Sequence, residues 1–262
     1  MDEIIHTANS SKPNTSTQPT IELTSQAPGS GTTHLIYLIT ATAILPTSAG
    51  GNNACVAILD ADGTFSTFRL AQQLRFRHPS VDLESVLAHV HIFRPQSLSS
   101  LTATLANLPT YFLYSPHSSH NRHLAFIALD SLTAFHWQGK SAEEDLPFSD
   151  GEANESTNLP SLPMALKSAS SALSTPVIFT THLPQNSTAP TLRLTLRRRP
   201  VKKFPPTLSV LEALREAGDR QRAVERAGWE AVCEERGATR GMGFGFRITD
   251  DGVLLEGEET TG

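Results

Sequence analysis

The stretch "TIELTSQAPGSGTTHLIYLITATAIL", residues 20–45, determines the fold, because a strand pattern, a glycine-rich turn and a helix pattern follow one another in it. "TIELTS" (20–25) alternates apolar and polar residues, and "TTHLIYLITATAIL" (32–45) has helical length with apolar faces. A glycine-rich turn between a strand and a helix is the setting of a phosphate-binding loop, where backbone N–H groups at the helix start can hold an anion. The stretch therefore predicts the first strand–helix unit of an α/β domain.

The turn departs from the usual phosphate loop at two positions. That loop reads Gly-x-x-x-x-Gly-Lys-Ser/Thr, and its lysine contacts the β- and γ-phosphates. Here Gln26 replaces the first glycine and Thr32 replaces the lysine, whereas Thr33 keeps the hydroxyl that ligates magnesium. The candidate nucleotide-binding residues of the turn are Gly29, Ser30, Gly31, Thr32 and Thr33. A plain glycine-rich turn without a ligand is the alternative interpretation.

Strands and helices continue to alternate along the chain. The expected strands are "NACVAILDADG" (53–63), "HVHIFRP" (89–95), "HLAFIALDSLTAF" (123–135) and "TPVIFTTHL" (175–183), and the expected helices span 65–78, 97–108 and 164–173. Continuous apolar runs such as 53–60 are typical of strands buried on both faces of a parallel sheet. The sequence thus predicts an α/β fold with a mostly parallel sheet flanked by helices.

The last third of the chain has a different character. "TLRLTLRRRPVKKF" (191–204) reads as an edge strand that becomes basic, and residues 207–237 read as one long charged helix. "MGFGFRITDDGVLLEG" (242–257) reads as a closing β-hairpin with Asp-Asp-Gly at its turn. We therefore expect one domain over residues 20–257 that ends in a helix and a hairpin.

Composition sets limits on the rest. The chain has 262 residues, of which 39% are hydrophobic, a low share that suggests a core with unfolded segments beside it. Residues 1–19 are rich in Ser, Thr, Asn and Pro, and residues 139–161 are acidic and polar, so we expect a disordered tail and a disordered insertion. Residues 258–262 are expected to be a short tail. The net charge of −5 gives no overall attraction to nucleic acid.

The chain also lacks the signals of secretion and of membrane insertion. Cys55 and Cys233 are far apart and have no metal-ligand spacing, so reduced thiols are expected. No apolar run approaches the ~20 residues that span a bilayer, and the N-terminus does not resemble a signal peptide. We expect an intracellular protein without a membrane partner.

Two carboxylates follow buried strands and are candidates for chemistry. Asp130 ends the run "LAFIAL" as the Walker B residue does, where a carboxylate helps to hold magnesium. In "LDADGTF" (59–65), Asp62 could orient or deprotonate an attacking water, whereas Asp60 is expected to cap or tether the loop. The alternatives are an ordinary strand end and an Asp-Gly turn.

These motifs together resemble a known family. "ILDADGTF" (58–65) is similar to the strand-end motif of RecA-type recombinases, which have glutamate at the position of Asp62. "TATAILPTSAGG" (40–51) and "ALDSLTAFHW" (128–137) resemble a group of eukaryotic recombinase paralogues with Ile-Leu-Pro-x-Ser-x-Gly-Gly and Leu-Asp-Ser-Leu-Ser-Ala-Phe-Tyr-Trp at these places. The resemblance is good over residues 20–138 and loose beyond, and the insertions would suit a divergent, fungal member.

The resemblance implies a RecA-like P-loop ATPase core that binds ATP and magnesium. Thr33 and Asp130 would be ligands of the magnesium, and Asp62 would be the catalytic residue if the site is active. It also implies a nuclear subunit of a recombinase-paralogue complex for homologous recombination repair of DNA double-strand breaks. Its partner would be another recombinase paralogue, and single-stranded or branched DNA would be reached through the complex. An active DNA-dependent ATPase of the RecA family is the alternative.

The departures from the family bear on activity and on DNA. Without the loop lysine, we expect weak ATP binding and weak or absent hydrolysis. The regions where recombinases carry their DNA loops, 139–161 and 184–191, are acidic or lack basic residues. The concentrated basic run is Arg197, Arg198, Arg199, Lys202 and Lys203. It could bind phosphates weakly, or it could be a solvated hairpin or part of a nuclear import signal.

Overall fold

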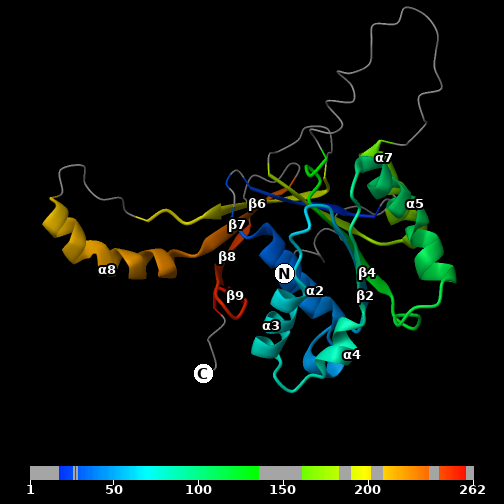
Figure 1. Cartoon of the computed structure of the whole chain (residues 1–262), viewed down its shortest axis with the longest axis horizontal. Coiled ribbons are helices and arrows are strands. Elements are labelled where there is room, and N and C mark those ends of the chain that lie inside the picture. The colour runs from blue at the N-terminus through cyan, green and yellow to red at the C-terminus, as the bar shows by residue number, and fades with distance from the viewer. Residues whose placement is uncertain are drawn as a thin grey trace, which may run out of the picture.

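The computed structural model describes residues 18–25, 27, 29–135, 161–182, 190–201, 209–235 and 242–257. Within these residues, nine strands form one sheet in the order β3-β2-β4-β5-β1-β6-β7-β8-β9, with helices on both faces (Figure 1). The strands are β1 (Thr20–Thr24), β2 (Cys55–Asp60), β3 (Val90–Phe93), β4 (Leu124–Asp130), β5 (Val177–Thr181), β6 (Leu192–Arg198), β7 (Trp229–Glu235), β8 (Gly243–Ile248) and β9 (Val253–Leu255). The helices are α2 (Thr32–Ile44), α3 (Thr67–Arg77), α4 (Leu83–Leu87), α5 (Leu98–Tyr114), α7 (Leu162–Leu173) and α8 (Val210–Ala227), with a 3₁₀ turn η1 at Thr47–Ala49.

The parallel part of the sheet confirms the predicted α/β architecture. All neighbours from β3 through β6 in the sheet order pair in parallel, and β2, β4 and β5 lie side by side. Alternate residues of β2 enter two cores: Val56 and Ile58 pack with α2 and α3, whereas Ala57 and Leu59 pack with α5 and α7. A strand buried on both faces needs the unbroken apolar run from which it was predicted.

Two expectations for the C-terminal third are wrong. Residues 191–204 were expected to form an edge strand, but β6 is internal and pairs with both β1 and β7. The helix expected over residues 207–237 ends at Ala227, and residues 229–235 form β7 instead. Gly228 ends α8 with φ 62, and the following "WEAVCEE" alternates, so that Ala231 and Cys233 enter the core. Burying these side chains beside β6 overrides the helical propensity of the glutamates between them.

The closing hairpin is confirmed, and other expectations are outside the described residues. β8 and β9 pair antiparallel around the Asp-Asp-Gly turn. The expectations for residues 1–17, 139–160 and 258–262, and those for Gln26, Lys202 and Lys203, fall on parts of the chain that the structure does not describe. Cys55 and Cys233 are both buried, and neither takes part in a disulfide bond. In the described ranges, none of the helices has the length and apolar character that crossing a membrane requires.

A buried histidine fixes the loop that precedes β4. His91 on β3 lies with Nδ1 2.8 Å from Tyr111 Oη and Nε2 2.7 Å from Ser119 Oγ. His91 is 8% exposed, and burial, with the nearby His117 and His89, lowers its pKa to about 4. His91 is thus neutral in the folded protein over a pH range in which an unfolded histidine is charged.

This difference predicts that His91 makes stability depend on pH. Between pH 6.5 and 4 the unfolded chain binds a proton that folded His91 does not, so the free energy of unfolding falls as the solution is acidified through this window. From pH 7.5 to 4.5 the contribution of His91 to the loss is about 2 to 3 kcal/mol. Urea unfolding across this range should show a smaller loss for His91→Asn than for the parent. The exposed control His120→Asn should follow the parent, and parallel curves for His91→Asn and the parent would contradict the prediction.

Candidate functional site

The glycine-rich turn joins the end of β1 to the start of α2. Gly31 precedes the helix with φ 90 in the left-handed region, and it offers no side-chain cap to the first helical N–H groups. A Cβ on Gly31 would lie 2.8 Å from Ile248 Cδ1 and 3.1 Å from Phe246 Cε2, so β8 packs directly against the turn. The uncapped N–H groups and the positive end of the helix dipole make this an electropositive backbone position.

The residues predicted to bind nucleotide and magnesium converge at the carboxyl ends of the strands. A cavity of about 350 Å³ is lined by residues 29–33, by Asp62 beyond β2, by Asp130 at the end of β4 and by His182 beyond β5. Thr33 Oγ1 donates a hydrogen bond to Asp130 Oδ2 at 2.8 Å, and Thr180 Oγ1 donates to Asp130 Oδ1 at 2.6 Å. The cavity thus lies at the edge of the sheet where α/β proteins bind their ligands, beyond the carboxyl ends of the strands. The roles of these residues toward ATP and magnesium stay predictions.

The cavity is acidic. Burial raises the pKa of Asp130 above its ordinary value, hydrogen bonds from Thr180 and Thr33 oppose this, and the nearby Asp62 and Asp60 add to it. Burial also raises the pKa of Asp62, against the attraction of His182. A polyphosphate in the cavity would therefore meet carboxylates that already repel one another.

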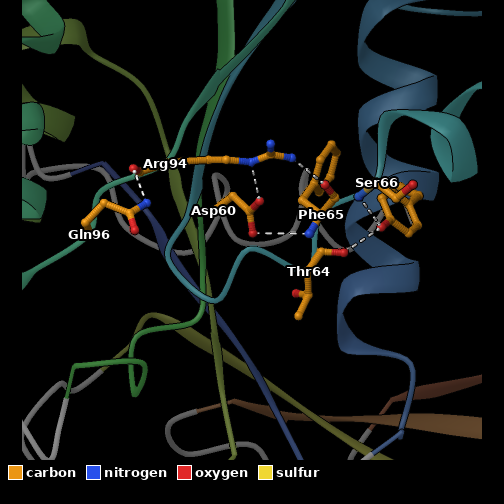
Figure 2. A network of polar contacts seen from close by, with 7 residues as sticks. Asp60, Thr64, Phe65, Ser66, Arg94 and Gln96 are labelled. Atoms are coloured by element: carbon orange, nitrogen blue, oxygen red, sulfur yellow. Dashed lines mark hydrogen bonds and ion pairs between the residues drawn. The ribbon is translucent and has the colours of Figure 1, made fainter.

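Asp60 tethers the loop that carries Asp62, as expected from the sequence. Its Oδ1 accepts a hydrogen bond from the Phe65 backbone at 3.1 Å, and its Oδ2 pairs with Arg94 Nε at 3.0 Å. Arg94 also donates to the Phe65 carbonyl at 3.2 Å, so that Asp60, Phe65 and Arg94 each contact the other two (Figure 2). On the other side, the Ser66 backbone donates to Tyr37 Oη on α2 at 2.9 Å. The loop is thus fixed between β2, β3 and α2.

Five further side chains line the cavity and were not identified from the sequence: His34, Tyr37, Thr64, Ser66 and Arg69. They belong to the first turns of α2 and α3 and to the tethered loop between β2 and α3. Arg69 is the one lysine or arginine among the lining residues that the structure describes. Burial and the charge of Arg69 lower the pKa of His34. The positions of these five side chains depend on the Asp60 tether and on tertiary packing, so the sequence held no local signal for them.

The arginines of the basic run contact their own chain. Arg197 pairs with Glu230, and Arg199 binds both carboxylate oxygens of Glu256 at 2.8 and 2.6 Å. The Arg198 guanidinium lies 5.2 Å from the centre of the Trp229 ring. Such pairs reduce the positive charge available to DNA phosphates, although exposed pairs contribute little stability.

The residues fit ATP and magnesium only in part. A threonine hydroxyl and a carboxylate are oxygen ligands of the kind that magnesium prefers, and magnesium commonly completes its shell with phosphate and water oxygens. Thr33 and Asp130 would hold the metal, and the 29–33 backbone would hold phosphates. No group of three or more His, Cys, Asp or Glu side chains that could hold a metal occurs among the described residues. Thr32, at the lysine position, supplies no positive charge.

Comparison with known proteins finds a distant relative among DNA repair proteins. The chain is 31% identical over 112 residues to the mouse protein named DNA repair protein XRCC2. The match covers 42% of this chain and 38% of the mouse protein, so the chain is a distant, partial homologue that spans well under half of that relative. No family model matches the chain.

Proposed function

We propose that this protein is a subunit of a recombinase-paralogue complex that supports homologous recombination repair of DNA double-strand breaks in the nucleus. The observation that carries the proposal is the similarity to a DNA repair protein over 112 residues. The mostly parallel sheet with a strand–turn–helix start is compatible with a RecA-like core. DNA would be reached through the complex, because Arg197 and Arg199 are paired within the chain.

The ATP site of this subunit is degenerate in the proposal. A lysine contact to a γ-phosphate is a charge-assisted hydrogen bond that contributes ~1.5–3 kcal/mol, so its loss at Thr32 lowers nucleotide affinity by roughly one to two orders of magnitude. Asp62 and Asp130 in the cavity add repulsion to the phosphates. The subunit would act mainly through its contacts with other proteins.

An active DNA-dependent ATPase is the second candidate, and the contact between Thr33 and Asp130 favours it. This hydrogen bond holds the two candidate magnesium ligands in place although the turn has no lysine. The two candidates differ in one assay. Magnesium-dependent ATP hydrolysis by the purified chain with single-stranded DNA, abolished by Asp130→Ala, would establish the ATPase, whereas hydrolysis at background rate supports the degenerate site.

Partner binding is predicted to reside in the folded core. We expect the chain, co-expressed with recombinase paralogues of its own organism, to co-purify with one of them. Deleting 1–19 and 143–158 together should leave the complex intact, because these polar segments hold too little apolar surface for a stable interface. Circular dichroism controls for folding of the truncated chain. Loss of the partner from a folded truncated chain would place the interface in the deleted segments, and failure of every paralogue to bind the full chain would count against the proposed function.

A further inference from the structure

One face of α3 holds the C-terminal hairpin by its backbone. Arg69, Gln73 and Arg77 recur every four residues, so they lie on the same side of the helix. Arg69 Nη1 donates to the Asp250 carbonyl at 2.6 Å, and Arg69 Nη2 donates to the Thr249 carbonyl at 3.2 Å. Arg77 Nη2 donates to the Val253 carbonyl at 3.1 Å. The hairpin of β8 and β9 is thereby fastened to the helix that begins at the cavity.

Gln73 is the buried part of this contact. Its amide pairs with the backbone of Val253 as a neighbouring strand would, accepting from the N–H at 2.6 Å and donating to the carbonyl at 3.2 Å. Gln73 is 1% exposed, and a Cβ on Gly252 would lie 2.2 Å from its Oε1. Even one methyl group at residue 252 would therefore push the hairpin away from α3.

Arg69 belongs to both the hairpin contact and the cavity. It lines the cavity with the 29–33 turn, and its guanidinium is at the same time held by the two hairpin carbonyls and by Gln72 Oε1 at 3.0 Å. A phosphate oxygen accepts a stronger, charge-assisted hydrogen bond from arginine than a neutral carbonyl does. An anion that enters the cavity therefore competes with the hairpin for one guanidinium.

We propose that Arg69 couples the cavity to the β8–β9 hairpin, so that a bound polyphosphate and a docked hairpin oppose each other. The docked hairpin withholds from the cavity the cation that could offset phosphate charge. Binding of a polyphosphate draws Arg69 from Thr249 and Asp250 and loosens the hairpin. The inference rests on the proposed function only in treating the cavity as a site for a phosphate-bearing ligand.

The test uses the full chain with inorganic pyrophosphate as the probe and hydrogen exchange as the readout. Pyrophosphate should speed amide exchange across residues 249–255 of the parent protein. Arg69→Ala should show fast exchange there without the probe and about tenfold weaker pyrophosphate binding. Arg69→Lys keeps the charge but lacks the planar fork that spans the Thr249 and Asp250 carbonyls, so it should loosen the hairpin while weakening binding less than Arg69→Ala does.

The distinguishing variant is Gly252→Ala, which disturbs the hairpin without touching the cavity. It should strengthen pyrophosphate binding by about tenfold, because it frees Arg69 for the anion. Gln73→Ala should do the same and replaces Gly252→Ala if that chain does not fold. The control Arg75→Ala removes one exposed charge from α3 and should alter neither hairpin exchange nor binding.

Three results would overturn the coupling: slower hairpin exchange with pyrophosphate, weaker binding by a folded Gly252→Ala or Gln73→Ala chain, or no binding by any variant. None of these results bears on whether the chain co-purifies with a recombinase paralogue. The proposed function is lost only if that co-purification fails, so the two failures are separable.

Discussion

Replacing Asp60 by alanine is expected to lower the free energy of unfolding by about 2 to 4 kcal/mol. Asp60 is 1% exposed at the end of β2, and its carboxylate satisfies the backbone N–H of Phe65, which is also buried. Alanine would leave that N–H without its acceptor and would remove the ion pair to Arg94. The cost comes from an orphaned buried donor and a lost tether, since an ion pair to a partly exposed arginine contributes little by itself.

Urea unfolding at neutral pH measures this effect, and two matched variants locate its cause. Asp60→Asn keeps an oxygen that can accept from Phe65 but loses the charge, so its loss should be about half that of alanine. Asp251→Ala, in the exposed turn of the closing hairpin, should stay within about 0.5 kcal/mol of the parent. Equal losses for Asp60→Ala and Asp251→Ala would show that the tether does not hold the loop that carries Asp62.

The parallel sheet could be predicted from the sequence because its strands have strong local signals. β2 and β4 are unbroken apolar runs that end in aspartate, and such runs form buried strands in nearly any α/β context. β7 lacked such a signal. Its glutamates favour a helix, and only pairing with β6, more than thirty residues earlier in the chain, places Ala231 and Cys233 in the core. Gly228 was the local sign of the break between α8 and β7.

Some residues of the candidate site could likewise be predicted from the sequence, and others could not. The 29–33 turn, Asp62 and Asp130 could be brought together from the sequence, because the carboxyl ends of parallel strands meet at one edge of a sheet. Arg69 and Tyr37 could not be placed at the cavity from the sequence. Their positions depend on how the tether at Asp60 and the hairpin turn the start of α3 toward α2, which is a matter of tertiary packing.

Thr32→Lys is expected to raise the affinity for ATP by roughly one to two orders of magnitude. Thr32 is the first residue of α2 and lines the cavity, so a lysine stem can enter it from the position that phosphate loops use. The ammonium would offset phosphate charge in a cavity that holds Asp62 and Asp130. We expect turnover to rise much less than affinity, because Asp62 is only proposed to orient the attacking water and the substitution does not change its position.

Equilibrium binding of ATP with magnesium checks the affinity, and phosphate release checks turnover. Thr47→Lys is the matched control, since it adds the same charge at an exposed position in η1 and should leave affinity unchanged. If both lysine variants bind equally more tightly, the gain reflects net charge and the 29–33 turn is not a phosphate site. If neither gains affinity while both remain folded, the cavity does not accept ATP, and any role of this chain in repair rests on its contacts with other proteins.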